Sequence, residues 1–137
     1  MKVQDCIFFN IAKANQAATR FWSKHIARLS LTAVQGMVLG FLYEEDSVTS
    51  RSLGDRTVLD SATLTGVLDR LEALGLVERR ANPADRRAIL ILLTDEGRKT
   101  AAEIAEIMRS ANREFLDVFP SEEEKQLRKA LIKIRES

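Results

Sequence analysis

Apolar side chains recur every three or four residues over most of the chain, and this spacing predicts α-helices. The expected helices cover residues 5–28, 32–45, 50–56, 61–74, 94–118 and 121–134. Polar residues at their starts support these bounds. Thr32 with Gln35, and Ser121 with Glu124, have the spacing of a capping box, while Thr94 is a simple N-cap. The chain is therefore expected to be mainly helical.

The hydrophobic period changes between Gly75 and Thr94. Gly75 stands where a helix C-terminus favours a left-handed residue. Beyond it, the short segments 76–80 and 88–93 are rich in β-forming residues and flank a turn at 82–86. This pattern predicts a β-hairpin with a basic loop. We therefore expect an all-α fold with one small β-hairpin wing after a pair of helices, which is a winged helix-turn-helix.

Composition fits one domain spanning residues 1–137. Hydrophobic residues make up 45% of the chain and aromatic residues 6%, so aliphatic helix packing is expected to dominate. No apolar run approaches the roughly 18 residues of a membrane span, and no signal peptide is recognisable. The single cysteine, Cys6, excludes an internal disulfide. These features predict a cytoplasmic protein with no membrane contact.

Positive charge is concentrated locally, although the whole chain carries a net charge of only +1. Seven arginines and no lysine lie between Arg51 and Arg87. Arginine suits bidentate contacts to phosphates and base edges better than lysine does. A solvated charged face is the alternative interpretation. The distribution is therefore typical of a nucleic-acid-binding surface without proving one.

The helix 61–74 is the expected DNA-reading element, because a helix fits the major groove. Its N-terminus is expected to present free N–H groups to a phosphate. Two arginines on the hairpin loop are expected to enter the minor groove, and Asp85 is interpreted as holding one of them in place. The predicted DNA contacts are Arg51, Ser61, Thr63, Thr65, Gly66, Arg70, Arg86 and Arg87.

Four segments together resemble the MarR family of transcriptional regulators. They are Leu59–Glu72 (LDSATLTGVLDRLE), Gly75–Arg79 (GLVER), Asp85–Arg87 (DRR) and Leu93–Gly97 (LTDEG). The resemblance implies a homodimer on a pseudo-palindromic operator, with a DNA-binding region at 30–94 and dimerisation helices at 1–29 and 95–137. It also implies that Asp85 and Arg87 are paired wing residues. Gly54 departs from the alanine expected on the short helix.

The resemblance further implies that an effector releases the DNA, and two kinds of effector stay open. Cys6 lies where a branch of the family senses organic hydroperoxides, but Asn10 replaces the tyrosine that such sensors place four residues later. The other candidate is a small aromatic or anionic ligand. Its expected pocket residues are Lys13, Arg20, Trp22 and His25.

An enzyme is not expected. One histidine and one cysteine offer no catalytic triad, and no HExxH, CxxC or phosphate-binding glycine loop is present, so neither a metal nor a cofactor is predicted. The sequence therefore predicts a sequence-specific, double-stranded-DNA-binding regulator, a repressor released by a small ligand. A thiol-based peroxide-sensing repressor and a winged-helix protein-interaction module remain as alternatives.

Overall fold

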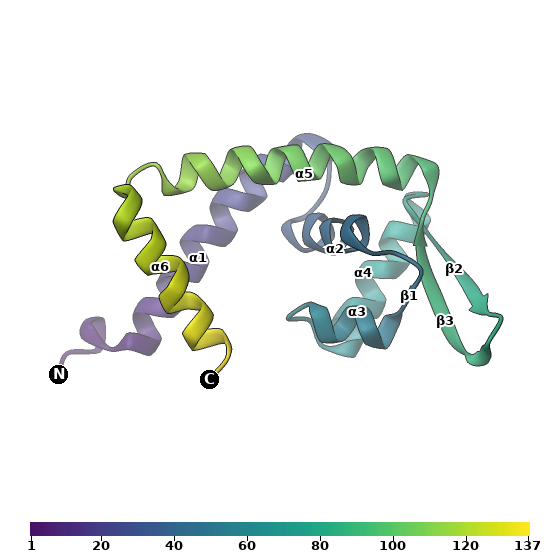
Figure 1. Ribbon diagram of the computed structural model, residues 1–137, viewed down its shortest axis with the longest axis horizontal. Coiled ribbons are helices and arrows are strands. Elements are labelled where there is room, and N and C mark those ends of the chain that lie inside the picture. Colours follow the sequence, from purple (N-terminus) through teal and green to yellow (C-terminus); the bar gives the residue numbers. More distant parts are fainter.

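The computed structural model describes all residues from 1 to 137 and contains six α-helices and one three-stranded sheet (Figure 1). The helices are α1 (Ile7–Ile26), α2 (Ala33–Glu44), α3 (Ser50–Arg56), α4 (Ser61–Ala73), α5 (Asp95–Leu116) and α6 (Ser121–Arg135). The strands are β1 (Val48–Thr49), β2 (Val77–Asn82) and β3 (Asp85–Leu93). Short 3-10 helices occupy Val3–Asp5 and Ala27–Leu29. The predicted winged helix-turn-helix is confirmed.

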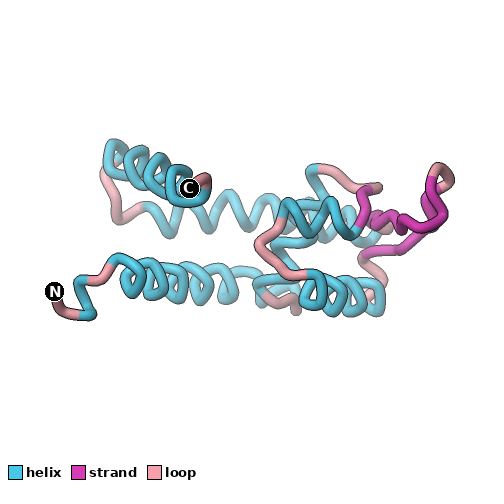
Figure 2. The backbone as a smooth tube through the Cα atoms, turned by 90° about the horizontal axis from the view of Figure 1, so that it is seen from below, coloured by secondary structure: helices cyan, strands magenta, loops and turns pink.

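The molecule has two ends joined by α5 (Figure 1). We call residues 33–93, which hold α2, α3, α4 and the sheet, the lobe. We call residues 1–21 and 112–137, which include α6 and most of α1, the arm. Figure 2 shows that α1 and α6, which overlap in Figure 1, lie apart from each other. Both chain termini belong to the arm.

One hydrophobic core of 19 buried residues lies under the lobe and against the first two-thirds of α5. Helix α4 contributes Leu64, Leu68 and Leu71, each at most 1% exposed, from the stripe that the spacing predicted. The core begins at Trp22 and ends at Ala111, so the arm contributes no buried residue to it. The packing that stabilises this chain is therefore confined to the lobe and its junction with α1 and α5.

Helix starts follow two predicted caps, Thr32 and Thr94, and depart from the third. Thr32 and Gln35 form the expected capping box, and the Asp60 and Thr94 side chains cap α4 and α5. The capping box at Ser121 is wrong: Pro120 occupies the N-cap of α6 without a side-chain bond, and Glu124 instead contacts Arg128. Two outer bounds also differ, since α1 begins at Ile7 and α5 ends at Leu116.

Two glycines allow α4, β2 and α5 to meet closely. Gly75 has φ +74°, the left-handed conformation that ends α4. A Cβ at Gly97 would lie 1.8 Å from the Leu76 carbonyl oxygen, so the first turn of α5 accepts only glycine there. Thr94 completes the junction, because its hydroxyl donates to the Gly75 carbonyl and accepts from the Gly97 amide. The wing is thus fixed at its base to both helices.

The sheet is larger than predicted. Its strands run antiparallel in the order β1-β3-β2, with Val48 of β1 opposite Ile91. The sequence analysis missed β1 because two residues carry no periodic signal. The hairpin strands are also longer than the predicted 76–80 and 88–93, which leaves only Pro83 and Ala84 in the turn.

No single helix is long and apolar enough to cross a membrane. The only candidate by length and composition is the pair Ile7–Leu29 and Ala33–Glu44, which is bent by 76°.

Candidate nucleic-acid interface

The face of α4 opposite the core is polar and open. Ser61, Thr63, Thr65, Gly66 and Arg70 are all exposed. They alternate with the buried leucines, because positions three and four apart share one face of a helix. This single helix therefore presents all five of its residues that the sequence assigned to DNA.

The N-terminus of α4 is occupied by its own cap. The Asp60 carboxylate accepts the Thr63 amide proton at 2.8 Å. Hydrogen bonds from the backbone and the side chain of Thr63 hold the pKa of Asp60 below its usual range. The expectation that this terminus offers free N–H groups to a phosphate is therefore wrong in part: a negative charge already sits there. The Thr65 hydroxyl is likewise engaged, since it donates to the Ser61 carbonyl at 2.9 Å.

Gly66 has no role in the packing of the chain. A Cβ at this position would meet no atom within 4 Å. Glycine inside a helix costs about 1 kcal/mol relative to alanine. The residue leaves the middle of the exposed α4 face without a side chain, so an approaching surface could come close to the helix backbone there.

A register shift shapes the tip of the wing. Asn82 pairs with Asp85 while the preceding Ala81 pairs with Ile89, so three β3 residues have no partner on β2. Two of the three are Arg86 and Arg87, which are both exposed. They lie in a bulge of the strand, not in the loop where the sequence analysis put them. Such bulges commonly re-aim side chains at a sheet edge.

Asp85 orients the wing through the backbone. Its Oδ1 accepts the Arg87 amide proton at 3.0 Å, and no ion pair joins it to either neighbouring guanidinium. Asp85 was interpreted as holding one arginine in place, and the contact it makes is with the backbone amide of Arg87. The carboxylate fixes the bulge and leaves both guanidinium groups free.

The seven arginines between Arg51 and Arg87 divide into two groups. Three are ion-paired: Arg56 with Glu44 and Glu45, Arg79 with Asp69 and Glu72, and Arg80 with Glu78. The other four have no hydrogen-bonding or ionic partner for their side chains, and they are Arg51, Arg70, Arg86 and Arg87. The free set coincides with the four arginines that the sequence assigned to DNA.

The sequence analysis missed the two contacts that hold the reading elements in place. Arg79 of β2 bridges Asp69 and Glu72 of α4 at 2.8 and 3.1 Å, which ties the wing to the helix. Asp46 accepts from the Leu93 amide and from Arg98, which ties the wing base to α5. Only the i, i+3 spacing of the two acids on α4 could have indicated the first contact.

These elements lie on one side of the molecule. Helix α3, the start of α4 and the tip of the β2–β3 hairpin all lie on the side of the lobe away from α5 (Figure 1). A long rod placed along that side would meet the helix pair and the wing tip together. The arrangement is suited to a double helix with adjacent grooves.

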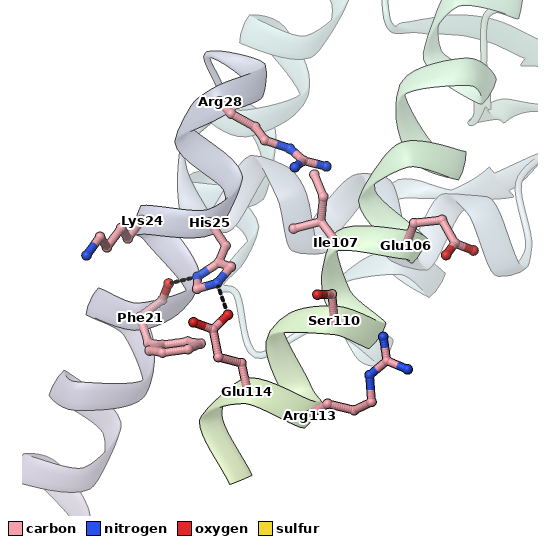
Figure 3. Close-up of a pocket in the computed structure, with 9 residues that line it drawn as sticks. All are labelled: Phe21, Lys24, His25, Arg28, Glu106, Ile107, Ser110, Arg113 and Glu114. Atoms are coloured by element: carbon pink, nitrogen blue, oxygen red, sulfur yellow. Dashed lines mark hydrogen bonds and ion pairs between the residues drawn. The ribbon is translucent and has the colours of Figure 1, made fainter. Parts of the chain in front are cut away.

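The four residues predicted to line an effector pocket do not come together. Trp22 is buried in the core and donates from its indole to the Ala33 carbonyl. His25 lies on another face between α1 and α5 (Figure 3). Lys13 and Arg20 are exposed, and Lys13 contacts only Gln16. The single pocket expected from the sequence is thus not formed by this set.

A different and mainly apolar cavity lies beside Trp22. It measures about 440 Å³ and opens between α1, α2 and the turn that joins α3 to α4. Its walls include Met37, Phe41, Val58 and Leu59, with Arg56 at its edge. No group of three or more His, Cys, Asp or Glu side chains is placed to hold a metal ion.

The fold and the surface define a winged helix-turn-helix protein, and comparison with known proteins identifies its family. Residues 29–88 match the MarR family. The transcriptional regulator HosA of Escherichia coli O111:H- is 31% identical over 124 residues, which cover 90% of either chain. The organic hydroperoxide resistance transcriptional regulator of Bacillus subtilis is 32% identical over 97 residues, 71% of this chain and 66% of that one.

Solved structures agree. A probable transcriptional regulator from Pseudomonas aeruginosa superposes with a TM-score of 0.89 at 32% identity, covering 97% of this chain and 99% of the other. Bordetella bronchiseptica BpsR superposes with a TM-score of 0.93 at 25% identity, and the alignment covers 100% of this chain and 98% of BpsR. A variant of E. coli MarR complexed with operator DNA superposes with a TM-score of 0.87 at 28% identity, and the alignment covers 93% of this chain and 92% of the other.

The chain belongs to the MarR family. Curated relatives that it matches are named as transcriptional regulators. For the first three curated relatives, the matched segment spans 66%, 46% and 63% of the relative's length.

Proposed function

We propose that this protein is a homodimeric repressor that binds a pseudo-palindromic operator in double-stranded DNA and is released by a small ligand. The exposed face of α4 enters the major groove, and Arg86 and Arg87 at the wing tip enter the adjacent minor groove. We place the protein in the cytoplasm together with that DNA. The E. coli MarR variant that is complexed with operator DNA supports this arrangement.

The pairing state of the arginines carries the proposal. An arginine already bound to a carboxylate must break that contact before it can neutralise a phosphate, whereas a free one gains a partner at once. The four free arginines lie on α3, α4 and the wing tip, while the paired ones brace those same elements. A merely solvated surface would not separate the two sets by position.

The arm supports the homodimer. It exposes a set of large apolar side chains, and its helix α6 buries no residue. These side chains are Val3, Ile7, Phe8, Phe9, Ile11, Phe115, Val118, Phe119, Leu131, Ile132 and Ile134. An apolar surface of this extent is typical of an interface between subunits. A second copy presents the matching surface by symmetry.

The test is DNA binding by matched arginine variants. The operator is first selected from genomic fragments with purified protein, and affinity is then measured by fluorescence anisotropy over a salt series. Arg70→Ala and Arg87→Ala should each weaken binding by about 1–3 kcal/mol. Arg80→Ala, on the same hairpin but paired with Glu78, is the control and should change affinity little.

The salt series separates phosphate contacts from base contacts. A variant that loses a phosphate contact should reduce the log–log salt slope by about 1, whereas loss of a base contact should relax sequence preference. A protein that binds no duplex at low salt would instead support the protein-interaction module.

The cavity beside Trp22 is the proposed effector site. Its volume and apolar walls suit a small aromatic compound. It touches α1, α2 and the turn before α4, so a bound ligand could tilt the reading helix. BpsR, whose DNA binding is regulated by 6-hydroxynicotinic acid, supports an effector of this chemical class.

Trp22 is the only tryptophan and lines this cavity, so its fluorescence is the natural probe of a ligand bound there. 6-Hydroxynicotinic acid and a panel of related aromatic acids should quench it and release the operator over the same concentration range. Met37→Trp, which fills the cavity, should prevent release. Release without quenching would place the effector site elsewhere.

Cys6 remains the second candidate for the release step. The residue is half-buried at the N-cap of α1, beside the arm surface, and its thiol is free. The similarity to an organic hydroperoxide resistance regulator favours this alternative. Cumene hydroperoxide should then release the operator from the wild type but not from Cys6→Ser. Equal behaviour of the two proteins would leave ligand binding as the release mechanism.

A further inference from the structure

One histidine joins the last turn of α1 to α5. The His25 Nδ1 lies 2.9 Å from the Phe21 carbonyl oxygen, and Nε2 lies 2.9 Å from Glu114 Oε2 (Figure 3). The imidazole also stacks on the Phe21 ring, with 4.4 Å between centroids, and Phe21 in turn meets Phe115 at 5.0 Å. The His25 side chain is only 23% exposed, so its position is well defined by these neighbours.

Both partners of the ring can only accept hydrogen bonds. A carbonyl oxygen and a carboxylate each need an N–H, but a neutral imidazole has only one. In the neutral state, one of the two contacts would therefore set a nitrogen lone pair against an oxygen lone pair. Only the doubly protonated ring satisfies both contacts, so the geometry itself selects imidazolium.

The surrounding charges are mixed. Lys24 of α1, Arg28 of the following 3-10 helix, and Glu106 and Arg113 of α5 line the same pocket as Glu114, and α2 contributes no residue to it. Glu106 is paired with Arg109. The pKa of His25 is raised above its ordinary value of 6.5, first by the bond to the Phe21 carbonyl and then by Glu114, against opposing effects of partial burial and Lys24.

The contact lies where the arm leaves the lobe. Helix α5 continues from β3 into the arm, and α1 returns from the arm toward α2 (Figure 1). Ala111, one turn before Glu114, is the last buried residue of α5. Beyond that point the ion pair is the only polar side-chain contact between α1 and α5. The ion pair therefore joins the two helices where the buried core has ended.

We propose that His25 and Glu114 form a clasp that is closed by a proton. In the homodimer, this clasp sets the spacing between the lobe of one subunit and the lobe of the other. With His25 protonated, the clasp holds α1 against α5 and keeps both copies of α4 at the operator spacing. Loss of the proton removes one of the two bonds, and the lobes lose that fixed spacing. This inference rests on the proposed homodimer and its DNA target.

The sign follows from the direction of the shift. A histidine whose pKa is raised in the folded protein stabilises the clasp fully at pH values below its pKa in the unfolded chain. That contribution is lost as the pH rises through its pKa in the folded protein. DNA affinity is therefore expected to fall with rising pH above the ordinary histidine range. Histidine is the side chain whose charge changes over physiological pH, so a cell could use this response.

Glu114→Gln tests the clasp without removing it. The glutamine amide can donate to the bare Nε2 of a neutral ring, so the bond to α5 survives without the proton. Glu106→Gln is the matched control, because it neutralises another glutamate of α5 in the same pocket that does not contact His25. His25 is the only histidine, so its imidazole protons give one set of titrating signals in NMR spectra of each full-length protein.

Wild type and Glu106→Gln should titrate above the ordinary histidine value, and Glu114→Gln should titrate lower. Between pH 6 and 8.5, operator affinity of the wild type should fall by about fivefold more than that of Glu114→Gln. The titration is run on the free protein and needs no DNA.

Identical titration of wild type and Glu114→Gln would overturn the clasp, whatever happens to DNA. If the His25 titration differs between wild type and Glu114→Gln but operator affinity depends on pH equally in both, the clasp exists and does not control the spacing of the lobes. Absence of duplex binding at every pH would overturn the proposed function and the regulatory role with it, while the NMR titration would still show whether the clasp itself exists.

Discussion

The lobe and the arm differ in what completes them. The segment from Trp22 to Ala111, which includes the lobe, supplies all 19 members of the core, whereas residues 1–21 and 112–137 supply none. The arm instead exposes phenylalanines, leucines and isoleucines on α1 and α6. The proposed DNA-reading part is therefore packed within one chain, whereas the arm exposes large apolar side chains that the proposed homodimer would cover.

The largest expected effect breaks the lobe. Leu68→Ala removes a side chain that is 1% exposed at the centre of α4, and should lower the free energy of unfolding by about 2–5 kcal/mol. Leu74→Ala, in a side chain that is 50% exposed at the end of the same helix, is the control. Urea denaturation measures both. Equal costs for the two variants would contradict the core described above.

The next effect breaks the arm. Phe8→Asp puts a charge on a side chain that is 78% exposed within one chain, so it should leave the fold intact and dissociate the dimer. Losing the second half-site should weaken operator binding by about 100-fold or more. Sedimentation velocity gives the oligomeric state. Val58→Asp, in a fully exposed side chain of the lobe, should remain dimeric; a dimeric Phe8→Asp would count against the arm as the interface.

Two glycines of the lobe, Gly54 on α3 and Gly66 on the exposed face of α4, separate an effect on stability from an effect on DNA binding. Gly54→Ala would place a Cβ at an ordinary 3.6 Å from Leu64, and Gly66→Ala would meet nothing. Both helix positions should gain about 0.5–1 kcal/mol of stability by thermal unfolding. Only Gly66→Ala should weaken DNA binding, by about tenfold if the α4 backbone lies close to the groove. Equal DNA affinity in the two variants would remove Gly66 from the interface.

The smallest effect concerns the α4 cap. Because the pKa of Asp60 is lowered in the folded protein, its cap stabilises the lobe fully at pH values above its pKa in the unfolded chain. That contribution is lost as the pH falls through its pKa in the folded protein. Asp60→Asn can still cap the helix but does not titrate. As the pH falls below about 4, the melting temperature of the wild type should therefore decrease more than that of the variant. Parallel curves would show that the cap does not respond to acid.

Local signals in the sequence were enough to locate the helices. Thr32 with Gln35 and Asp60 with Thr63 are within three residues of each other, so their bonds follow from spacing. Ser121 shows the limit of the same rule, because Pro120 took the N-cap position and the box did not form. The recognition residues were predictable for the same local reason: they occupy the polar face of one amphipathic helix.

Contacts between distant segments were not predictable. His25 was predicted to line an effector pocket, and its contact with Glu114 was missed because that residue is 89 positions away. The two-residue β1 exists only through its pairing with β3. Which arginines are free also depends on tertiary neighbours, since Arg79 is held by two acids of the preceding helix. Charge counts alone could not have divided the seven arginines.

Helix α5 has a mechanical consequence. It runs unbroken for 22 residues from the wing base into the arm, which at 1.5 Å per residue makes a rigid lever of about 33 Å. A tilt of about 5° at one end displaces the other by about 3 Å, close to the rise between neighbouring base pairs. In the proposed homodimer, small rearrangements among subunit contacts would thus be amplified into a mismatch of one step along the double helix.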